Sequence, residues 1–202
     1  FRIEDVCTPE AWHKDPEKCV EFYNMRRRET LAAEPNLAHT AIARLQEAFP
    51  DTQVITQNID NLHERAGSRN VLHLHGEITK LRSQKNVHDL VDLDGWEQHY
   101  GDLHPDGSIL RPHIVFFGED VPNFPLACEI ASQADIIIVV GTSLNVYPAA
   151  SLLMYAPAHA EIYLIDPNEP NLTYYADRIG HIQAPATEGV PALVEALIEQ
   201  YS

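Results

Sequence analysis

A group of polar side chains directly follows a short segment of buried-strand character. A buried core does not require polar side chains at this point. Gln53–Thr56 has the character of a buried strand, and Gln57, Asn58 and Asp60 come straight after it. Ligands of parallel α/β sheets bind in the crevice outside the carboxyl ends of the strands, so we expect these side chains to project into such a crevice. The pair His75-Gly76 follows soon after, and an imidazole with an ordinary pKa of ~6.5 can act there as an acid or base.

Each of these residues also has an ordinary structural explanation. His75 is one of 11 histidines and could lie in a turn, and Asp60 could cap a helix. Gly141-Thr-Ser143 by itself is a weak turn signal. We favour a functional site because the histidine occurs together with the polar group that follows the strand.

Two helices are predicted ahead of this segment. Asp15 can cap the first helix, and Pro16 suits its first position. Its expected inward face carries, at helical spacing, Cys19, Phe22, Tyr23 and Arg26. The second helix is predicted from Leu37 to Phe49, with an inward face of Ile42, Leu45 and Ala48.

The second half of the sequence continues with alternating strands and helices. Ala134–Ser143 contains a β-branched run of the kind that is buried on both faces of a parallel sheet. A further strand is predicted at Glu161–Ile165, and a closing amphipathic helix at Val190–Gln200. Polar residues again follow the strands, Thr142-Ser143 after one and Asp166 after the other. We therefore predict an α/β fold built on a parallel sheet.

A change of composition marks an insertion. Residues 80–110 are polar, carry Trp96 and Tyr100 among many charges, and show no strong periodicity. We assign them to a small insertion module. Residues 1–79 and 111–202 then form the main domain.

The bulk properties limit the classes of partner. A net charge of −16 and a pI near 4.9 argue against nucleic acid as a direct ligand, because phosphate binding needs clustered positive charge. The apolar run Ile136–Val140 is too short to span a bilayer, so we expect no membrane partner. The 3 cysteines include no CxxC pair, which indicates reduced thiols. We expect a monomeric cytoplasmic protein.

These residues, in this order, closely resemble the sirtuins, the NAD-dependent protein-lysine deacylases, whose signature reads Thr-Gln-Asn-Ile-Asp followed by His-Gly. The likeness extends over essentially the whole chain, including Arg111–Glu119, Gly141–Ser143 and Tyr147–Ala150. The resemblance implies a Rossmann-like NAD-binding domain with a small inserted module. It also implies NAD as cofactor and acylated lysines of proteins as substrates.

The resemblance assigns the nicotinamide side of the site. Gln57 would contact the nicotinamide-side ribose, and Asn58 with Asp60 would line the nicotinamide pocket. His75 would be the general base. In the implied mechanism the acyl carbonyl oxygen attacks C1′ of the ribose, nicotinamide leaves, and His75 activates a ribose hydroxyl that captures the resulting imidate.

The resemblance also assigns contacts on the adenosine side. Thr142 and Ser143 would meet the phosphates and ribose of NAD, and Asp166 the adenosine ribose. Further cofactor contacts are expected from Arg2, Gly141 and Ala186.

The substrate would add as a strand to the segment after Arg111. The residues expected to pair with the peptide are Ile114, Val115, Phe116, Gly118 and Glu119. The resemblance is closest to the branch that removes succinyl and malonyl groups, in which a Tyr-x-x-Arg pair, here Tyr23 and Arg26, holds the acyl carboxylate. Arginine suits bidentate carboxylate recognition, and on this helix face Arg26 would be partly buried and in want of an anion. Tyr23 could instead be plain core and Arg26 a solvated charge.

Several positions depart from the family pattern. The family's small domain usually holds zinc with two CxxC pairs, but Ser83 stands where the first cysteine is expected, so we predict no metal. We expect surface positions for the module's and flanking histidines, which are His88, His99, His104 and His113. Cys7 replaces the alanine usual before Thr-Pro. The family's first strand and glycine-rich phosphate loop would precede Phe1, and a loop of roughly ten residues would follow Arg2, so we expect these segments to lie outside this sequence.

Two other functions use the same residues. The pocket could hydrolyse NAD or transfer ADP-ribose, although such an enzyme has no reason to keep the Arg111–Glu119 segment. The chain could also sense NAD without catalysis, which the presence of His75 disfavours.

Overall fold

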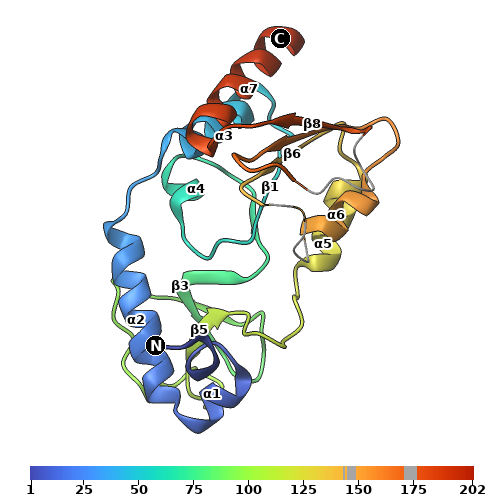
Figure 1. Cartoon of the computed structure of the whole chain (residues 1–202). Coiled ribbons are helices and arrows are strands. Elements are labelled where there is room, and N and C mark those ends of the chain that lie inside the picture. Colours follow the sequence, from blue (N-terminus) through green and yellow to red (C-terminus); the bar gives the residue numbers. More distant parts are fainter. Residues whose placement is uncertain (143, 145–148, 171–176) are drawn as a thin grey trace. The chain divides into compact units, whose positions relative to one another are not determined.

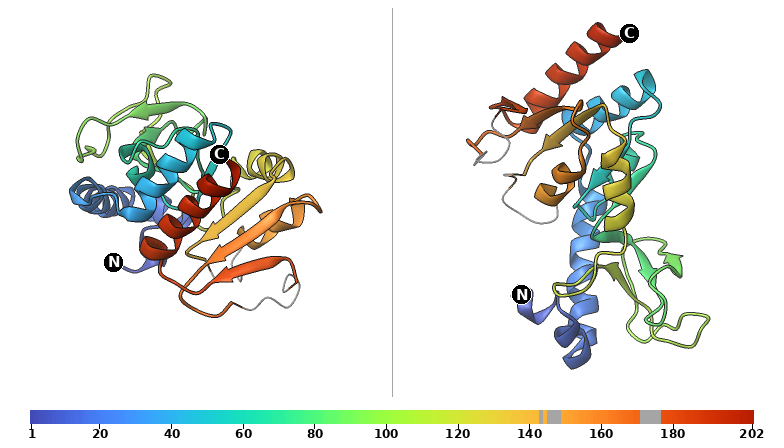
Figure 2. Two further views of the ribbon diagram at one scale, coloured as in Figure 1. Left: turned by 90° about the horizontal axis from the view of Figure 1, so that it is seen from above. Right: turned by 90° about the vertical axis from the view of Figure 1, so that its right-hand side faces the viewer.

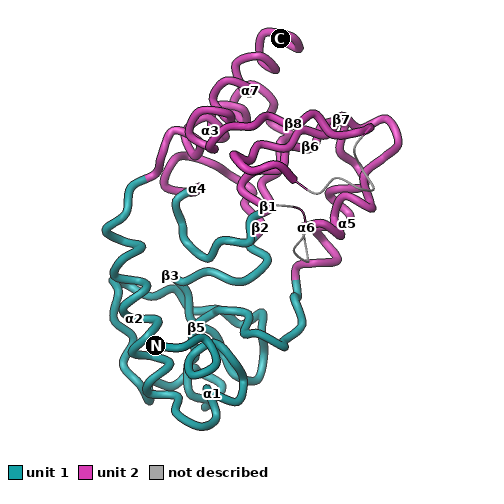
Figure 3. Tube along the Cα trace, in the orientation of Figure 1, with its two compact units in different colours: residues 1–34, 56–62, 73–122 teal, residues 35–55, 63–72, 123–202 magenta. Residues whose placement is uncertain are grey.

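The computed structural model describes residues 1–142, 144, 149–170 and 177–202. The chain divides into two compact units (Figure 3). Unit 1 comprises residues 1–34, 56–62 and 73–122, and unit 2 comprises residues 35–55, 63–72 and 123–202. Residues 80–110, the predicted insertion module, fall within unit 1, which extends well beyond them. Their boundaries as a separate module remain a prediction.

Unit 1 combines N-terminal helices with an antiparallel sheet (Figure 1). Its helices are the 3-10 helix η1 (Ile3–Asp5), α1 (Pro9–Lys14) and α2 (Pro16–Ala32). Its sheet has the order β4-β3-β5, with β3 at Gly76–Arg82, β4 at Leu90–Asp92 and β5 at Arg111–Ile114. The core between them consists of Ala11, Trp12, Cys19, Val20, Tyr23, Ile78, Ile114 and Phe116.

The long helix α2 begins where the sequence predicts. The Asp15 carboxylate accepts a hydrogen bond from the backbone N–H of Lys18 at 3.0 Å, and Pro16 occupies the first helical position. Cys19 and Tyr23 lie on the buried face, as predicted, but Arg26 does not. The residue that continues this face is Arg27, four positions after Tyr23. The prediction had placed Arg26, three positions after Tyr23, on the face, but both spacings bring side chains to the same side of a helix and here the i+4 position is the buried one.

Arg27 is fully buried and connects three parts of unit 1. Its Nε donates to the Ile78 carbonyl of β3 at 2.6 Å, and one terminal nitrogen donates to Asn24 Oδ1 and to the Trp96 carbonyl, each at 2.8 Å. Burial lowers the pKa of Arg27 to about 10, so the guanidinium stays charged at neutral pH. Its bonds attach α2 both to the sheet and to the segment that carries Trp96.

Unit 2 contains a parallel sheet with the order β6-β7-β8, which confirms the predicted Rossmann-like α/β class (Figure 2). The strands are β6 (Ile136–Val140), β7 (Glu161–Ile165) and β8 (Ile179–Ile182). The accompanying helices are α3 (Leu37–Ala48), α5 (Phe124–Ser132), α6 (Ala149–Leu152), the 3-10 helix η2 (Leu153–Tyr155) and α7 (Ala186–Tyr201). The helices α3 and α7 share an apolar core with β7, formed around Leu45, Ile165 and Val194.

A close contact seats α7 on the sheet. A Cβ at Gly189 would lie 2.6 Å from a methyl carbon of Ile165, so only glycine lets the helix approach this strand without a shift. The predicted helix at Val190–Gln200 therefore exists but starts earlier, at Ala186, and includes this glycine.

Two details of the predicted core of unit 2 are wrong. Ala48 is exposed, because α3 ends there and the chain turns away at Phe49. The strand β6 is half-buried along its length, although its β-branched run predicted burial on both faces. Within the described residues β6 is one of the two edge strands of its sheet, and the most deeply buried positions belong to the central strand β7.

The strand that carries the polar signature forms a separate small sheet. β1 (Val54–Thr56) pairs with β2 (Val71–His73), and the short helix α4 (Leu62–Arg65) lies between them in the sequence. The chain passes from unit 2 to unit 1 at Thr56, so Gln57, Asn58 and Asp60 belong to unit 1. No helix in the described part of the chain has the length and apolarity needed to cross a bilayer.

The buried guanidinium of Arg27 makes a testable contribution to stability. Arg27→Met keeps most of the side-chain volume but leaves the carbonyls of Ile78 and Trp96 without their donor. Each buried unsatisfied group costs ~1–3 kcal/mol, so we expect the free energy of unfolding to fall by about 3 kcal/mol in urea titrations followed by circular dichroism.

The neighbouring Arg28 is the matched control. Arg28 is exposed and lies 5.4 Å from the centroid of the Trp96 ring, so Arg28→Met should cost about 1 kcal/mol or less. Equal losses in the two variants would show that the buried hydrogen bonds carry no special weight.

Candidate functional site

The ring of His75 is fixed by a carbonyl oxygen in unit 1. His75 Nδ1 lies 3.1 Å from the backbone oxygen of Gln57, which can only accept a hydrogen bond. Nδ1 must therefore carry the proton, and Nε2 of the neutral, half-buried ring keeps its lone pair. This is the tautomer that a general base requires. The structure thus brings together His75 and Gln57, two residues predicted for one site.

The glycine after His75 is required by a close approach between strands. Gly76 has a φ of +96°, and a Cβ there would collide with the backbone carbonyl of His113 on β5. The next backbone contact along the same edge joins the Val115 N–H to the His75 carbonyl at 2.9 Å. The backbone of His75 is therefore attached directly to the predicted peptide-binding segment.

The polar side chains after β1 are held by short local bonds. Thr56 Oγ1 accepts the Asn58 N–H, and Asp60 Oδ1 accepts the Leu62 N–H, each at 3.0 Å. Asp60 therefore bonds to the first residue of α4, which is close to the alternative explanation of a helix cap. One carboxylate oxygen in this bond leaves the other available for a ligand.

A second histidine, His73, contacts the same loop and was not among the predicted site residues. His73 is buried, and its Nδ1 lies 2.9 Å from the Asn58 carbonyl oxygen. Two successive loop carbonyls, those of Gln57 and Asn58, are thus each held by a histidine ring. The available signal was a second histidine two positions before His75, at the end of β2.

The predicted peptide segment is strongly held by internal contacts. Glu119 forms hydrogen bonds through both carboxylate oxygens, to Arg111 at 3.0 Å and to the Phe116 N–H at 2.7 Å. Burial raises the pKa of Glu119, but the bonds to Arg111 and Phe116 outweigh burial and hold the pKa below its usual range. The carboxylate is therefore ionised and already engaged.

Tyr23 and Arg26 are engaged with different partners. The Tyr23 side chain is buried, stacks on Phe116 at 6.1 Å between ring centroids, and donates its hydroxyl hydrogen to Cys7 Sγ at 3.2 Å. Burial, together with this hydrogen bond, raises the pKa of Tyr23. Arg26 is exposed and pairs with Glu29 at 2.9 Å, so the expectation of a partly buried arginine without an anion is wrong.

The predicted adenosine-side residues in unit 2 lie at the carboxyl ends of β6 and β7. Val140 and Ile165 are opposite each other in the parallel register. Thr142 and Asp166 therefore follow at the same end of the two strands. Gly141 makes the turn after β6 with a φ of +68°. Asp166 is buried and accepts the Asn168 N–H at 2.8 Å.

The other predicted cofactor residues are less connected. Ala186 is the first residue of α7. Arg2 is exposed and pairs with Asp5 at 3.2 Å. Ser143 lies outside the described residues.

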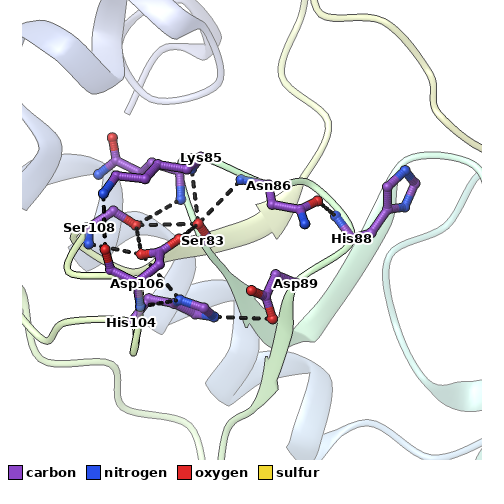
Figure 4. A network of polar contacts seen from close by, with 9 residues as sticks. Ser83, Lys85, Asn86, His88, Asp89, His104, Asp106 and Ser108 are labelled. Carbon is purple, nitrogen blue, oxygen red and sulfur yellow. Dashed lines mark hydrogen bonds and ion pairs between the residues drawn. The ribbon is translucent and has the colours of Figure 1, made fainter.

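A polar network occupies the position at which the family pattern has its first metal ligand (Figure 4). Asp106 accepts hydrogen bonds from the hydroxyls of Ser83 and Ser108, and the bond from Ser108 holds its pKa below the usual range. Ser83 Oγ accepts the backbone N–H groups of Lys85 and Asn86 at 2.9 and 3.2 Å. The network ties the turn after β3 to the loop around Asp106.

His104 is enclosed by the same network. Its Nε2 lies 3.3 Å from Asp89, and its Nδ1 accepts the Asp106 N–H at 3.1 Å. The ligand atoms of Asp89, His104 and Asp106 lie within 4.8 Å of one another. The donors do not fit the family's zinc, because no thiolate is among them and Nδ1 and the Asp106 oxygens already bond within the protein.

Two of the histidines expected at the surface are placed differently. His104 is buried among its carboxylate neighbours. His113 is half-buried on β5, and burial, with Arg82 and Lys80 nearby, lowers its pKa to about 4. Short sequence spacing did not reveal these positions, because Asp89 near His104 and Arg82 near His113 come from other parts of the chain.

Comparison with known proteins places these residues in a family. Residues 1–148 match the sequence profile of the Sir2 family. The chain is 53% identical over 170 residues to an NAD-dependent protein deacylase of Aggregatibacter actinomycetemcomitans, covering 84% of this chain and 80% of that protein. It is 47% identical over 203 residues to one of Bacteroides thetaiotaomicron, covering 98% and 86%.

Solved structures agree with the sequence comparison. A Sir2 homolog in complex with NAD superposes with a TM-score of 0.87 at 37% identity, covering 100% of this chain and 80% of that one. A Sir2 protein bound to a p53 peptide and NAD+ superposes with a TM-score of 0.74 at 28% identity, covering 98% and 82%. The matched profile, the identities and the shared fold establish that this chain belongs to the Sir2 family, as the resemblance to sirtuins predicted.

Proposed function

We propose that this Sir2-family enzyme uses NAD to remove acyl groups from protein lysines, with succinyl and malonyl groups among its substrates. The observation that carries the proposal is the contact of His75 Nδ1 with the Gln57 carbonyl, which assigns the Nδ1 proton and makes Nε2 the nitrogen that can accept a proton in the neutral ring. The backbone of His75 is bonded to the peptide-binding segment. The relatives named NAD-dependent protein deacylases support the same reaction class. The proposed products are nicotinamide and O-acyl-ADP-ribose.

NAD, when bound, supplies the electrophilic ribose carbon and the hydroxyl on which the acyl group is transferred. His75 takes the proton from that hydroxyl at Nε2, while the Gln57 carbonyl stabilises the ring through the Nδ1 proton. The Val115–His75 backbone bond sets the base beside the segment proposed to receive the peptide.

The remaining cofactor roles are proposals that follow the family pattern. Asn58 and Asp60 line the nicotinamide pocket, and Gln57 contacts its ribose. Thr142 and Asp166 serve the phosphates and the adenosine ribose. Contacts to NAD are proposed likewise for Arg2, Gly141, Ser143 and Ala186.

The acidic-acyl preference is proposed for Tyr23 and Arg26. Both must change partners to bind a carboxylate. The Arg26–Glu29 pair is exposed, and such pairs contribute only ~0–1 kcal/mol, so exchange for a substrate carboxylate costs little. The Tyr23 hydroxyl donates to sulfur, a weak acceptor, and a carboxylate oxygen would form a stronger bond.

We propose that the insertion module is held by hydrogen bonds and contains no structural metal. Ser83, Asp106 and Ser108 join its two loops, and His104 joins Asp89 to the same cluster. A carboxylate with several donors can supply the cross-link that four thiolates supply elsewhere.

The first experiment distinguishes deacylation from the other uses of NAD. The protein is incubated with NAD and matched acetyl-, succinyl- and malonyl-lysine peptides, and acyl-ADP-ribose is followed by mass spectrometry. Nicotinamide release that needs no peptide would support the NAD hydrolase alternative instead.

His75→Ala should reduce turnover by at least about 10²-fold, because general base catalysis typically contributes ~10²–10⁴. NAD affinity, measured by calorimetry, should stay within about threefold, since the base acts on a proton during the chemical step. His99→Ala, an exposed histidine elsewhere in unit 1, serves as the control and should behave as wild type. Activity of His75→Ala within tenfold of wild type would remove His75 from the role of base.

Arg26→Met should lower kcat/KM for a succinyl peptide by roughly 10- to 150-fold, the equivalent of a lost charge-assisted contact of ~1.5–3 kcal/mol. Deacetylation should change much less, because an acetyl group has no charge to lose. Arg28→Met, at an exposed arginine two positions on, should leave both activities unchanged. A parallel loss on both peptides in Arg26→Met would withdraw the acidic-acyl preference while keeping the deacylase proposal.

The module should contain no stoichiometric zinc. Metal analysis of the purified protein should find well below one zinc per chain, and chelators should leave activity intact, because the donor set holds no thiolates. One bound zinc would instead direct attention to Asp89, His104 and Asp106.

A further inference from the structure

A buried ionic cluster lies under the proposed peptide-binding segment of unit 1. Arg82 on β3 and Arg111 on β5 are direct neighbours across the antiparallel pair, and each is only 6% exposed. Glu119 contacts both: its two oxygens bond to Arg111 at 3.0 Å, and Oε2 lies 3.6 Å from Arg82. Like charges directly opposite on a sheet repel each other, so this carboxylate offsets the repulsion.

The cluster also reaches the backbone of the segment itself. Arg111 Nη2, which bonds to Glu119, also donates to the Ile114 carbonyl at 2.8 Å. Glu119 in turn accepts the Phe116 N–H at 2.7 Å. The Arg111 guanidinium lies 4.0 Å from the centroid of the Phe116 ring. Residues 111–119 are thereby closed into a loop by contacts between its two ends.

Several backbone N–H groups of the segment already have partners within the protein. The N–H groups of Val115 and Phe117 donate to the carbonyls of His75 and Cys7, each at 2.9 Å, and the Phe116 N–H is taken by Glu119. The Glu119 carboxylate is used by Arg111 and Phe116. These three N–H groups are therefore already used, so a peptide strand would have to bond to other backbone groups of the segment.

We propose that Arg111 and Glu119 are positioning residues, which hold the segment from Ile114 to Gly118 in the conformation that receives the substrate peptide. This inference rests on the proposed function of that segment. It differs from the sequence expectation for Glu119, because the carboxylate acts through Phe116 and Arg111 and does not itself touch the substrate. Arg82 completes the cluster as a second cation that the same carboxylate balances.

The cluster has little spare capacity to compensate for the loss of Glu119. Within the described residues, the Nε atoms of Arg82 and Arg111 are buried without a hydrogen-bond partner. Neutralising Glu119 would leave two facing guanidiniums without a counter-charge. Their repulsion would act at the Arg82–Arg111 end of the β3–β5 pair. The bonds from Glu119 to Arg111 and to the Phe116 N–H, which hold the segment itself, would be weakened at the same time.

The test compares Glu119→Gln with Asp120→Asn, a neutralised and exposed carboxylate at the next position. Initial rates are measured over ranges of acyl peptide and of NAD. We expect Glu119→Gln to raise KM for the peptide about tenfold or more, with kcat and KM for NAD within about threefold. Asp120→Asn should match wild type.

Two further variants separate positioning from direct contact and from misfolding. Adding Arg82→Gln to Glu119→Gln restores the net charge of the cluster and should return the peptide KM most of the way to wild type, which a lost substrate contact would not permit. Glu119→Asp keeps the charge but shortens the reach to the Phe116 N–H, so an intermediate KM is expected. If Glu119→Gln does not fold, Glu119→Asp decides.

The proposal is overturned by a peptide KM within about threefold of wild type in the folded variants, by no recovery in the double variant, or by parallel changes in kcat and both KM values. Absence of acyl-ADP-ribose formation by the wild-type protein would instead overturn the proposed function.

Discussion

The arrangement of unit 1 depends on one buried cation, Arg27, that has no carboxylate partner among the described residues. The Arg27 guanidinium is surrounded by oxygens of Asn24, Ile78 and Trp96, so backbone and amide dipoles stabilise its charge. The bonds reach α2, β3 and the segment around Trp96 at once. Because β3 begins at Gly76, the strand that α2 fixes is also the strand that positions His75. Loss of this charge would affect fold and site together.

The sequence was sufficient for the elements whose causes are local. Asp15 with Pro16 predicted the start of α2, and the β-branched run predicted β6, because caps and short-range periodicity act within a few residues. The motif also predicted that Gln57 and His75 belong to one site, and in the structure the His75 ring contacts the Gln57 carbonyl. The family followed from the same motif and is confirmed by the comparisons.

What the sequence missed depends on contacts between distant segments. Whether Arg26 or Arg27 faces the core depends on the rotation of α2 against β3, which differs by 100° between adjacent residues. His104 looked like a surface histidine because one of its partners, Asp89, approaches it only when two loops fold together, although the other, Asp106, lies in the same loop. Glu119 was predicted to contact the substrate. Nothing in the local sequence indicates that the chain turns back after Arg111 and brings Glu119, eight positions later, against the guanidinium.

The close approach at Gly76 has a consequence for variation in this enzyme. Backbone meets backbone there, so the spacing between His75 and Val115 is determined by main-chain geometry and is independent of which apolar side chains fill the nearby core. Those core residues can therefore be substituted over evolution, and each substitution changes the stability of the fold. The base and the peptide segment keep their separation throughout. Position 76 has no such freedom, since even one methyl group would push the strands apart. Selection on catalysis would accordingly be concentrated on a residue that has no side chain at all.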